Sequence, residues 1–148
     1  MGKAATNKSK FADLLDALSG AKSLLIMLQD SPDPDALAAA AALRRLANER
    51  TGAACSIACG GDVGRAENRA MLNYLDIRLR PVQELVETDY GAVAMVDTQP
   101  GHGNTTMPEE PFPHIVIDHH PTSQQARRVR CRDDRRNHGA PSPLLYAY

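Results

Sequence analysis

The sequence is poor in aromatic residues, with no tryptophan, two phenylalanines and four tyrosines among 148 residues. Single-stranded nucleic acids bind largely by stacking their bases on aromatic side chains, so this scarcity argues against a base-stacking surface. An excess of one charge is also missing, because 17 Lys and Arg face 18 Asp and Glu, for a formal net charge of -1. We therefore expect no stable binding of duplex nucleic acid and no general attraction to an anionic membrane. Any anionic substrate must be bound by a local site.

Long hydrophobic runs are absent as well. The longest uninterrupted apolar run covers residues 36–43, far short of the roughly 18 residues that indicate a membrane span. The N-terminal stretch MGKAATNKSK lacks the apolar segment of a signal peptide. These absences predict a cytoplasmic protein without a membrane span.

Cysteine is limited to Cys55, Cys59 and Cys131, an odd number that matches no CxxC or zinc-finger spacing. Cys55 and Cys59 lie in an apolar, strand-like run, where cysteine usually behaves as a small buried hydrophobe. We predict that all three are reduced thiols that bind no metal.

Apolar runs alternate with helical patterns along most of the chain. Apolar residues at helical spacing, followed by Gly20, predict a helix over residues 11–18. We expect further helices over 36–50 and 65–75, a helical turn over 82–87, and strands over 23–28, 53–59, 91–96 and 114–117. This alternation predicts an α/β fold with a Rossmann-like, mainly parallel sheet flanked by helices.

The character of the chain changes near Gln124. The tract RRVRCRDDRR, residues 127–136, has no clear period and leads into the proline-interrupted GAPSPLLYAY. We therefore divide the chain into a domain over residues 8–125 and an irregular segment over residues 126–148. The arginine tract has no interleaved aromatic residues, so a solvated tail is favoured over a nucleic acid-binding surface.

Acidic and imidazole side chains follow three of the predicted strands. They are Asp33 and Asp35 after the first, Asp97 after residues 91–96, and Asp118, His119 and His120 after residues 114–117. In an open parallel sheet, ligands bind beyond the carboxyl ends of the strands, so we expect these groups to form one site. Carboxylates gathered there repel each other by about 4 kcal/mol per pair at about 4 Å and an effective dielectric near 20. Either some are protonated or divalent cations neutralise them.

The donor types indicate which cations. Oxygen and imidazole ligands without thiolate favour Mn²⁺ or Mg²⁺, and two such ions are suited to hydrolysis of a phosphoester or phosphoanhydride. The Asp33-Pro34-Asp35 spacing can direct two carboxylates toward two metal positions, and Asp35 can also cap the following helix. A lone Asp-x-Asp is usually turn and cap chemistry, but groups at three strand ends together favour a metal site.

Three ordered motifs resemble the DHH phosphoesterase family. They are PDPDAL at residues 32–37, VDTQPGHGN at 96–104 and IDHHPTS at 117–123, and GRAENRAML at 64–72 is similar to a RecJ-like or exopolyphosphatase-related branch. The family includes RecJ-type exonucleases, oligoribonucleotide and 3'-phosphoadenosine 5'-phosphate hydrolases, exopolyphosphatases and manganese pyrophosphatases. The resemblance covers about residues 20–123 and implies the N-terminal part of a domain that uses two Mn²⁺ ions to hydrolyse a small nucleotide or short oligonucleotide. Phosphoanhydride hydrolysis of polyphosphate or pyrophosphate is the alternative.

The resemblance also implies roles for the metal-ligating residues. Asp33 is similar to a ligand of the first metal, and Asp97 to the carboxylate that bridges both metals. Asp35 and His119 are similar to ligands of the second metal. Asp97 and His119 are therefore expected among the catalytic residues.

The remaining expected roles concern substrate. His120 resembles the family's phosphate-contacting histidine and counts as catalytic, and Asp118 is expected to orient the imidazoles from behind. Arg65, at the start of a predicted helix, is a candidate for phosphate binding. Asn104 and His102, in the loop after the third strand end, are candidates beside it, although a glycine-flanked loop histidine is more often a solvated turn residue.

Two departures count against full activity. Gln29 stands where many family members have a histidine, and a neutral amide is a poorer ligand, so we expect the first metal to bind weakly unless Asp30 compensates. The family's fourth motif and its smaller substrate-binding domain do not follow before Tyr148, so we expect a truncated or frame-disturbed member. A non-catalytic remnant that binds metal or nucleotide weakly stays open beside an enzyme. The expected partner is a phosphorylated small molecule or short oligonucleotide, and a homodimer is left open.

Overall fold

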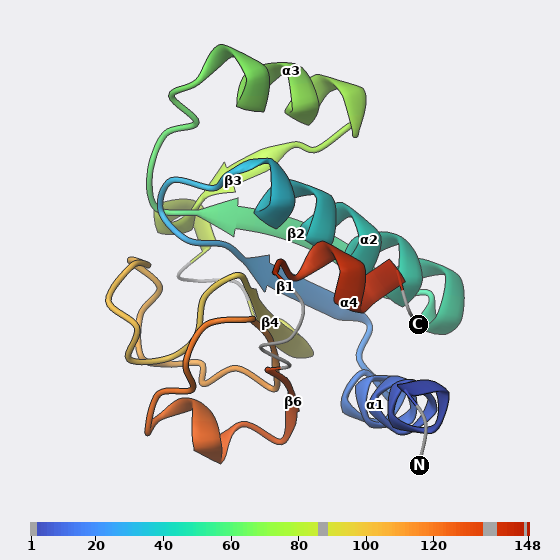
Figure 1. Ribbon diagram of the computed structural model, residues 1–148. Coiled ribbons are helices and arrows are strands. Elements are labelled where there is room, and N and C mark those ends of the chain that lie inside the picture. The colour runs from blue at the N-terminus through green and yellow to red at the C-terminus, as the bar shows by residue number, and fades with distance from the viewer. Residues whose placement is uncertain (1–2, 86–88, 135–138, 147) are drawn as a thin grey trace.

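The computed structural model describes residues 3–85, 89–134, 139–146 and 148. Six parallel strands form one sheet in the order β3-β2-β1-β4-β5-β6 (Figure 1). They are β1 Ser23–Met27, β2 Ala54–Cys59, β3 Leu79–Pro81, β4 Ala92–Val96, β5 Ile115–Ile117 and β6 Cys131–Asp133. This strand order is that of Rossmann folds. Strands β1 to β3 follow one another toward one edge of the sheet and β4 to β6 toward the other, so the order of the strands reverses between β1 and β4. The predicted α/β fold with a parallel sheet is confirmed.

The central strands β1 and β4 are covered on both faces. Every residue of β4 and all but the first of β1 are buried, as the continuous apolar runs predict. Alternate side chains point to opposite faces, so Ile26 and Ala94 belong to one hydrophobic cluster, and Met27 and Met95 to the other. Burial on both faces fixes the strands, and thereby the positions of the residues that follow them.

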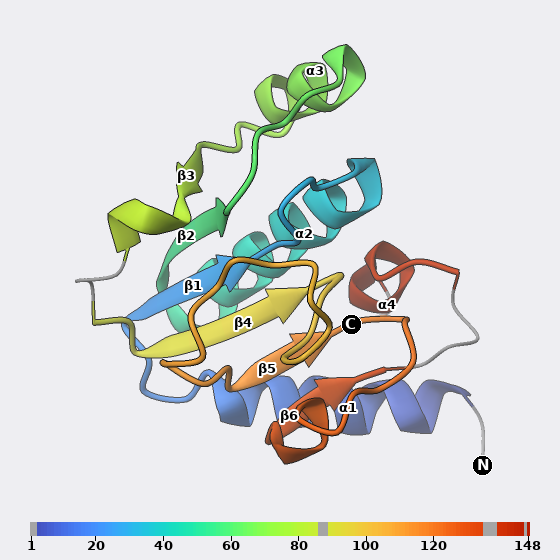
Figure 2. The same cartoon turned by 90° about the vertical axis from the view of Figure 1, so that its left-hand side faces the viewer.

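Helices cover one face of this sheet. The helices are α1 Lys3–Ala17, α2 Pro34–Thr51, α3 Ala66–Tyr74 and α4 Ser142–Tyr146. Leu14 of α1, Leu37 of α2 and Leu144 of α4 belong to the cluster on this face. In Figure 2, α2 lies behind the sheet. On the other face, Met107 and Phe112 from the loop after β4 pack against the second cluster.

The described part of residues 126–148 contains regular structure, so the prediction of an irregular segment is wrong for three of its parts. It contains the short 3-10 helix η2 Ala126–Arg128, the strand β6 and the helix α4. β6 pairs with β5 as an edge strand. Its three residues include Arg132 and Asp133, so it shows no apolar run by which a strand is recognised. Pro143 does not prevent α4, because proline is tolerated in the first helical turn.

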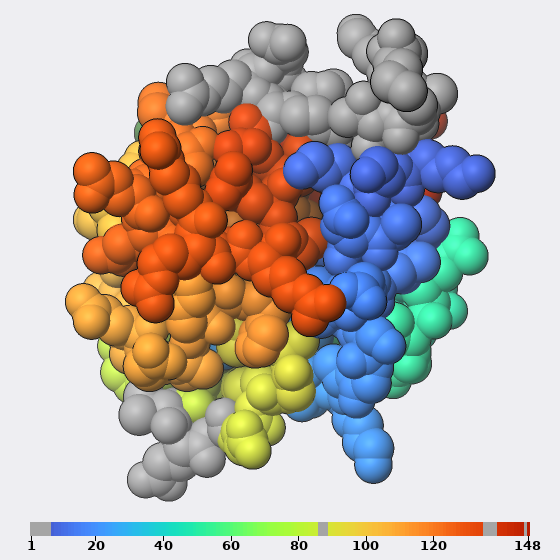
Figure 3. Space-filling view, turned by 90° about the horizontal axis from the view of Figure 1, so that it is seen from below, coloured from blue at the N-terminus to red at the C-terminus, as the bar shows by residue number. Residues whose placement is uncertain are grey.

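The edge strand β6 is covered by α1. Figure 3 shows α1 beside the chain that carries η2 and β6. Lys10 Nζ donates to the carbonyl oxygen of Arg132 at 2.7 Å, and Arg130 forms an ion pair with Asp16 at 2.6 Å. The arginine tract up to residue 134 is thus partly tied down, and its last two arginines lie outside the described residues. Covering an edge in this way prevents further strand addition.

Smaller elements gave mixed results. β3 was not predicted, because it is short and ends on a proline at the sheet edge. The 3-10 helix η1 Val82–Leu85 matches the predicted helical turn, whose last residue Glu87 lies outside the described residues. All three cysteines are free thiols. Among the described helices, none has the length and apolar character needed to cross a membrane.

Candidate functional site

Four metal-ligating side chains meet at the carboxyl end of the sheet. Asp97 follows β4, and Asp118, His119 and His120 follow the neighbouring strand β5. One potential ligand atom from each of these residues lies within 4.8 Å of the others. The parallel register pairs the last residues of β4 and β5, so strand pairing itself brings the four side chains together. We call this group the Asp97 cluster.

Asp97 is the centre of this cluster. It is 3% exposed and has a φ of 57°, in the left-handed region that costs most residues roughly 1–2 kcal/mol. Its Oδ1 lies 3.3 Å from His119 Nε2 and 3.9 Å from His120 Nδ1, yet has no hydrogen-bond partner among the described residues. Burial, followed by the negative charges of Asp33 and Asp118, raises the pKa of Asp97 from 3.8 to about 7. A buried oxygen that faces two imidazoles is well placed for a cation.

Asp118 holds the imidazole of His120. Asp118 is fully buried, and its Oδ1 lies 2.7 Å from His120 Nδ1 and accepts from the His120 backbone N–H at 3.2 Å. Its other oxygen accepts from Gln99 Nε2 at 2.7 Å, and Gln99 Oε1 in turn accepts from the Ser123 backbone N–H at 2.8 Å. Because Nδ1 faces a carboxylate, Nε2 is the nitrogen of His120 left for a ligand. Asp118 thus occupies the position of an orienting carboxylate.

Asp33 caps α2. Its Oδ1 accepts from the Ala36 backbone N–H at 2.9 Å, and Pro34 begins the helix. We expected Asp35 to be able to cap this helix, but the cap is Asp33, because the helix begins one residue earlier than Asp35. Asp35 lies in the first turn, where its charge favours the positive end of the helix dipole.

Asp35 is held by a residue from the far end of the chain. Ser142 Oγ, at the start of α4, donates to Asp35 Oδ1, and Asp35 Oδ2 is buried without a hydrogen-bond partner in the described part of the chain. Asp33 and Asp35 lie outside the Asp97 cluster but near enough for their charges to raise the pKa of Asp97. The structure thus brings the Asp-x-Asp turn to the rim of the site. Their roles as metal ligands stay predictions.

A chain of polar side chains ends on Asp97. Gln29 Nε2 donates to Asp97 Oδ2 at 3.2 Å, and Asn104 Nδ2 donates to Gln29 Oε1 at 3.2 Å. Thr98 Oγ1 donates to Asn104 Oδ1 at 2.5 Å. The position that the family resemblance assigns to a histidine is thus filled by an amide that contacts Asp97. The Asn104 side chain is engaged in this chain, and its predicted contact with substrate stays untested.

Asp30, the residue that could compensate for Gln29, is hydrogen-bonded to the loop after β4, and its compensating role stays a prediction. Asp30 Oδ1 accepts from the Thr106 backbone N–H at 2.8 Å and from Thr106 Oγ1 at 3.1 Å. Gly60 and Gly61 allow this approach, since a Cβ on Gly60 would lie 1.6 Å from Thr106 Oγ1 and one on Gly61 2.0 Å from the Asp30 carbonyl oxygen. The glycines after β2 therefore let the loop after β4 close over the carboxyl end of β1.

The GRAENR stretch positions the Asp-x-Asp turn. Asn68 is 7% exposed and donates from Nδ2 to the carbonyl oxygen of Pro32 at 3.1 Å. The Arg69 guanidinium bonds carbonyl oxygens of its own loop. Arg65 is exposed at the start of α3. Among the described residues, no side-chain hydrogen bond or ion pair joins it to the Asp97 cluster. Its phosphate-binding role stays a prediction.

Sequence reasoning missed two supporting residues and gave little weight to a third. Gln99 stands two residues after Asp97, so its place at a strand end was the available signal. Ser142 gave no local signal, because its partner lies 107 residues away. His102 was favoured as a solvated turn residue, yet its ring lies 5.0 Å from that of His120 and its Nδ1 is buried without a partner.

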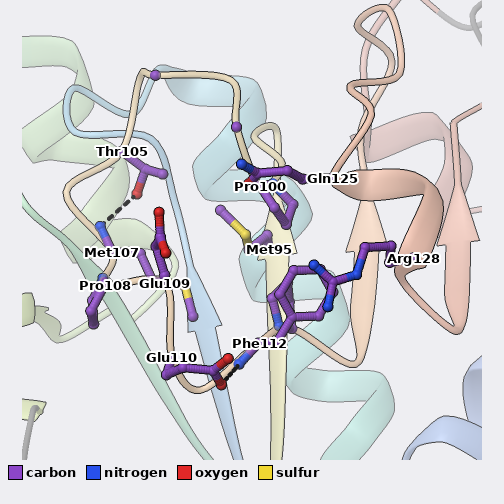
Figure 4. Close-up of a pocket in the computed structure, with 13 residues that line it drawn as sticks. Met95, Pro100, Thr105, Met107, Pro108, Glu109, Glu110, Phe112, Gln125 and Arg128 are labelled. Atoms are coloured by element: carbon purple, nitrogen blue, oxygen red, sulfur yellow. Dashed lines mark hydrogen bonds between the residues drawn. The ribbon is translucent and has the colours of Figure 1, made fainter.

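A separate cavity of about 330 Å³ lies beneath the loop after β4 (Figure 4). Met95, Phe112 and Arg128 line it, and the Arg128 guanidinium lies 4.9 Å from the centre of the Phe112 ring. None of the four residues of the Asp97 cluster is among its lining residues. The cavity is therefore not the pocket of the Asp97 cluster.

Comparison with known proteins places the fold but not the activity. No family model matches the sequence. The chain is 39% identical over 126 residues to the uncharacterized protein MJ1633 of Methanocaldococcus jannaschii, a match that covers 84% of this chain and 25% of that protein. An exopolyphosphatase-related protein from Bacteroides fragilis has a similar structure, with a TM-score of 0.70 at 16% identity over 94% of this chain and 42% of its own. The chain thus spans about a quarter of the Methanocaldococcus jannaschii protein and has the same fold as part of the Bacteroides fragilis protein.

Proposed function

We propose that this chain carries the catalytic centre of a metal-dependent phosphohydrolase. The proposal rests on Asp97, a carboxylate 3% exposed with one oxygen that faces two imidazoles and accepts no hydrogen bond from the part of the chain that the structure describes. Leaving such an acceptor buried costs about 1–3 kcal/mol. A buried acceptor left in this way calls for an explanation, and a bound cation is one. The shared fold of an exopolyphosphatase-related protein supports phosphate as the target.

The residues present fit a divalent first-row cation. Asp97, Asp118, His119 and His120 offer carboxylate oxygens and imidazole nitrogens without thiolate, a set that suits Mn²⁺. We propose Asp97 and His119 as ligands, with Asp33 and Asp35 contributing from the rim of the site. Mg²⁺ is the alternative ion. When bound, the cation supplies an activated water and neutralises phosphoryl oxygens.

The protein's own part is to place a phosphate beside that ion. Asp118 fixes the ring of His120 so that Nε2 is free to meet a phosphoryl oxygen. Gln99 holds Asp118 in turn, so the ring turns only if buried hydrogen bonds break. Such preorganised donors stabilise the charge that develops during phosphoryl transfer.

Within this class, we propose a phosphoester of a small nucleotide or short oligonucleotide as the substrate, in line with the DHH phosphoesterases whose motifs the sequence resembles. Polyphosphate is the second candidate, because the structurally similar Bacteroides fragilis protein is described as exopolyphosphatase-related. A remnant that binds metal without turnover is the third, favoured by the Gln29 amide on Asp97.

Titration calorimetry with Mn²⁺, combined with hydrolysis assays on 3'-phosphoadenosine 5'-phosphate, dinucleotides and polyphosphate, tests the proposal. We expect the native chain to bind Mn²⁺ and to hydrolyse one of these substrates. Asp97→Asn keeps the side-chain volume and should weaken Mn²⁺ binding by about 100-fold or more, together with loss of turnover. Asp13→Asn, which changes an exposed aspartate on α1, is the matched control and should behave as the native chain.

The outcomes separate the candidates. Absence of Mn²⁺ binding in the native chain contradicts a metal-dependent enzyme. Binding without turnover of all three substrates selects the remnant. Turnover that is equal in the native chain and in Asp97→Asn shows that another protein in the preparation is responsible.

A further inference from the structure

The two oxygens of the Asp97 carboxylate have different surroundings. Within residues 3–85, 89–134, 139–146 and 148, Oδ1 has no hydrogen-bond partner, and it lies 3.3 Å from His119 Nε2, whereas Oδ2 accepts a hydrogen bond from Gln29 Nε2 at 3.2 Å. A carboxylate that bridges two cations with one oxygen on each needs both oxygens open to a cation. An amide nitrogen has no lone pair for a cation and directs its positive hydrogens at the acceptor. On the Oδ2 side, the Gln29 amide therefore stands where a second cation would approach.

The amide of Gln29 is held in this orientation. Its Oε1 accepts from Asn104 Nδ2 at 3.2 Å, and Asn104 Oδ1 accepts from Thr98 Oγ1 at 2.5 Å. Thr98 is fully buried. If the Gln29 amide turned over, its Oε1 would face Asp97 Oδ2, and both are acceptors. Its Nε2 would face Asn104 Nδ2, and both are donors. Gln29 can therefore not turn unless Asn104 turns with it.

The loop that carries Asn104 is itself anchored to β1. The backbone N–H of Asp30 donates to the Asn104 carbonyl oxygen at 2.9 Å, and Asp30 Oδ1 accepts from Thr106. The polar chain from Thr98 to Asp97 thus lies between two fixed backbone segments. It is a built part of the site.

We propose that the site binds a single divalent cation, on the Oδ1 side of Asp97, and that the Gln29 amide occupies the place of a second one. The inference rests on the proposed function, since it concerns the same cluster. It differs from the two-ion site that the family resemblance implies, because one bridging oxygen is already hydrogen-bonded. The Asp97 cluster would then act with one metal ion and with Gln29 as a fixed donor that positions Asp97.

Mn²⁺ titration calorimetry of the native chain and of Gln29→His tests this inference. We expect one Mn²⁺ per chain for the native protein and two for Gln29→His, because an imidazole supplies a lone pair where the amide supplies hydrogens. Electron paramagnetic resonance gives an independent readout, with the hyperfine pattern of an isolated Mn²⁺ in the native chain and a spin-coupled pair in Gln29→His. Asn48→His, at the exposed far end of α2, is the matched control and should bind one ion.

Asn104→Asp provides a second route to the same result. It replaces the amide donor to Gln29 with an acceptor, so Gln29 should turn its nitrogen toward residue 104 and its oxygen toward the cluster. We expect a second Mn²⁺ to bind, but none with the charge-matched control Asn48→Asp. Circular dichroism and thermal melting establish that each variant is folded.

Each outcome has a separate meaning. Two ions in the native chain overturn the single-ion site while leaving the proposed function intact. One ion in both folded variants, Gln29→His and Asn104→Asp, overturns the role of the amide. No Mn²⁺ binding in any form contradicts the proposed function itself.

Discussion

Asp97 and Asp33 lie at the same edge of the sheet, but their carboxylates are used in different ways. Asp33 is exposed, and its Oδ1 accepts the Ala36 N–H as the cap of α2. Asp97 is buried, has a left-handed backbone, and keeps Oδ1 without a hydrogen-bond partner. The fold thus accounts for Asp33 as a helix cap, whereas no hydrogen bond among the described residues accounts for the buried Oδ1 of Asp97.

This difference distinguishes residues that stabilise the structure around the site from residues that are available to bind a ligand. A cap stabilises its helix whether or not a ligand is bound. A buried carboxylate with a raised pKa opposes folding until a cation or a proton neutralises it. We therefore expect substitutions near Asp97 to change metal affinity most, and substitutions of Asp33 to change stability as well.

After Asp97→Asn itself, the largest effect on metal affinity should come from Asp118→Asn, on the Asp97 side of the comparison. The substitution keeps the shape but removes the charge that holds His120 Nδ1 at 2.7 Å. Loss of such an orienting carboxylate typically weakens metal binding by about 10–100-fold. Mn²⁺ titration calorimetry measures it, with Asp134→Asn, a carboxylate paired with Arg132 outside the Asp97 cluster, as the control. Equal affinity in the two variants would mean that Asp118 does not act on the site.

A second effect concerns the stability of the metal-free chain. The pKa of Asp97 is about 7 in the folded chain against 3.8 ordinarily, so between these values the folded state holds more protons than the unfolded state. The free energy of unfolding should therefore fall as the pH rises through this window. Asp97→Asn removes the charge and should be more stable than the native chain at about pH 8, by about 1–2 kcal/mol after allowance for solvent screening.

Urea denaturation in a chelator at about pH 5 and about pH 8 measures this effect. Asp13→Asn, exposed on α1, controls for loss of a negative charge and should follow the native pH profile. A native chain that gains stability with pH across this window, relative to Asp97→Asn, would show that the Asp97 carboxylate is not strained by its surroundings.

The comparison also shows which parts of the site were predictable from the sequence. Asp97 and His119 could be placed together because each follows a buried apolar strand, and parallel strands end at one edge. The same reasoning gave the fold, since the runs that form β1 and β4 read as strands covered on both faces. These inferences depend on local patterns only.

The remainder depends on contacts between distant segments. Ser142 on Asp35 and Lys10 on Arg132 connect residues more than a hundred positions apart, and no local pattern announces them. The residues of β6 are mostly polar. The strand forms because it pairs with the free edge of β5 and because α1 covers β6 itself. Gln29 was recognised as a departure from the family motif, but its hydrogen bond to Asp97 needed the structure.

The smallest expected effect concerns Asp33 and separates its two roles. Asp33→Ala removes the cap on the Ala36 N–H and should lower the free energy of unfolding by about 1 kcal/mol, whereas Asp33→Asn keeps a capping oxygen and should leave it nearly unchanged. If the Asp33 charge also reaches the metal ion, both variants should weaken Mn²⁺ binding to the same extent. Urea denaturation and calorimetry on the two variants measure the two roles independently. A loss of Mn²⁺ affinity in Asp33→Ala alone would mean that Asp33 acts on the site only by holding α2 in place. Its charge, unlike that of Asp97, would then not reach the metal ion.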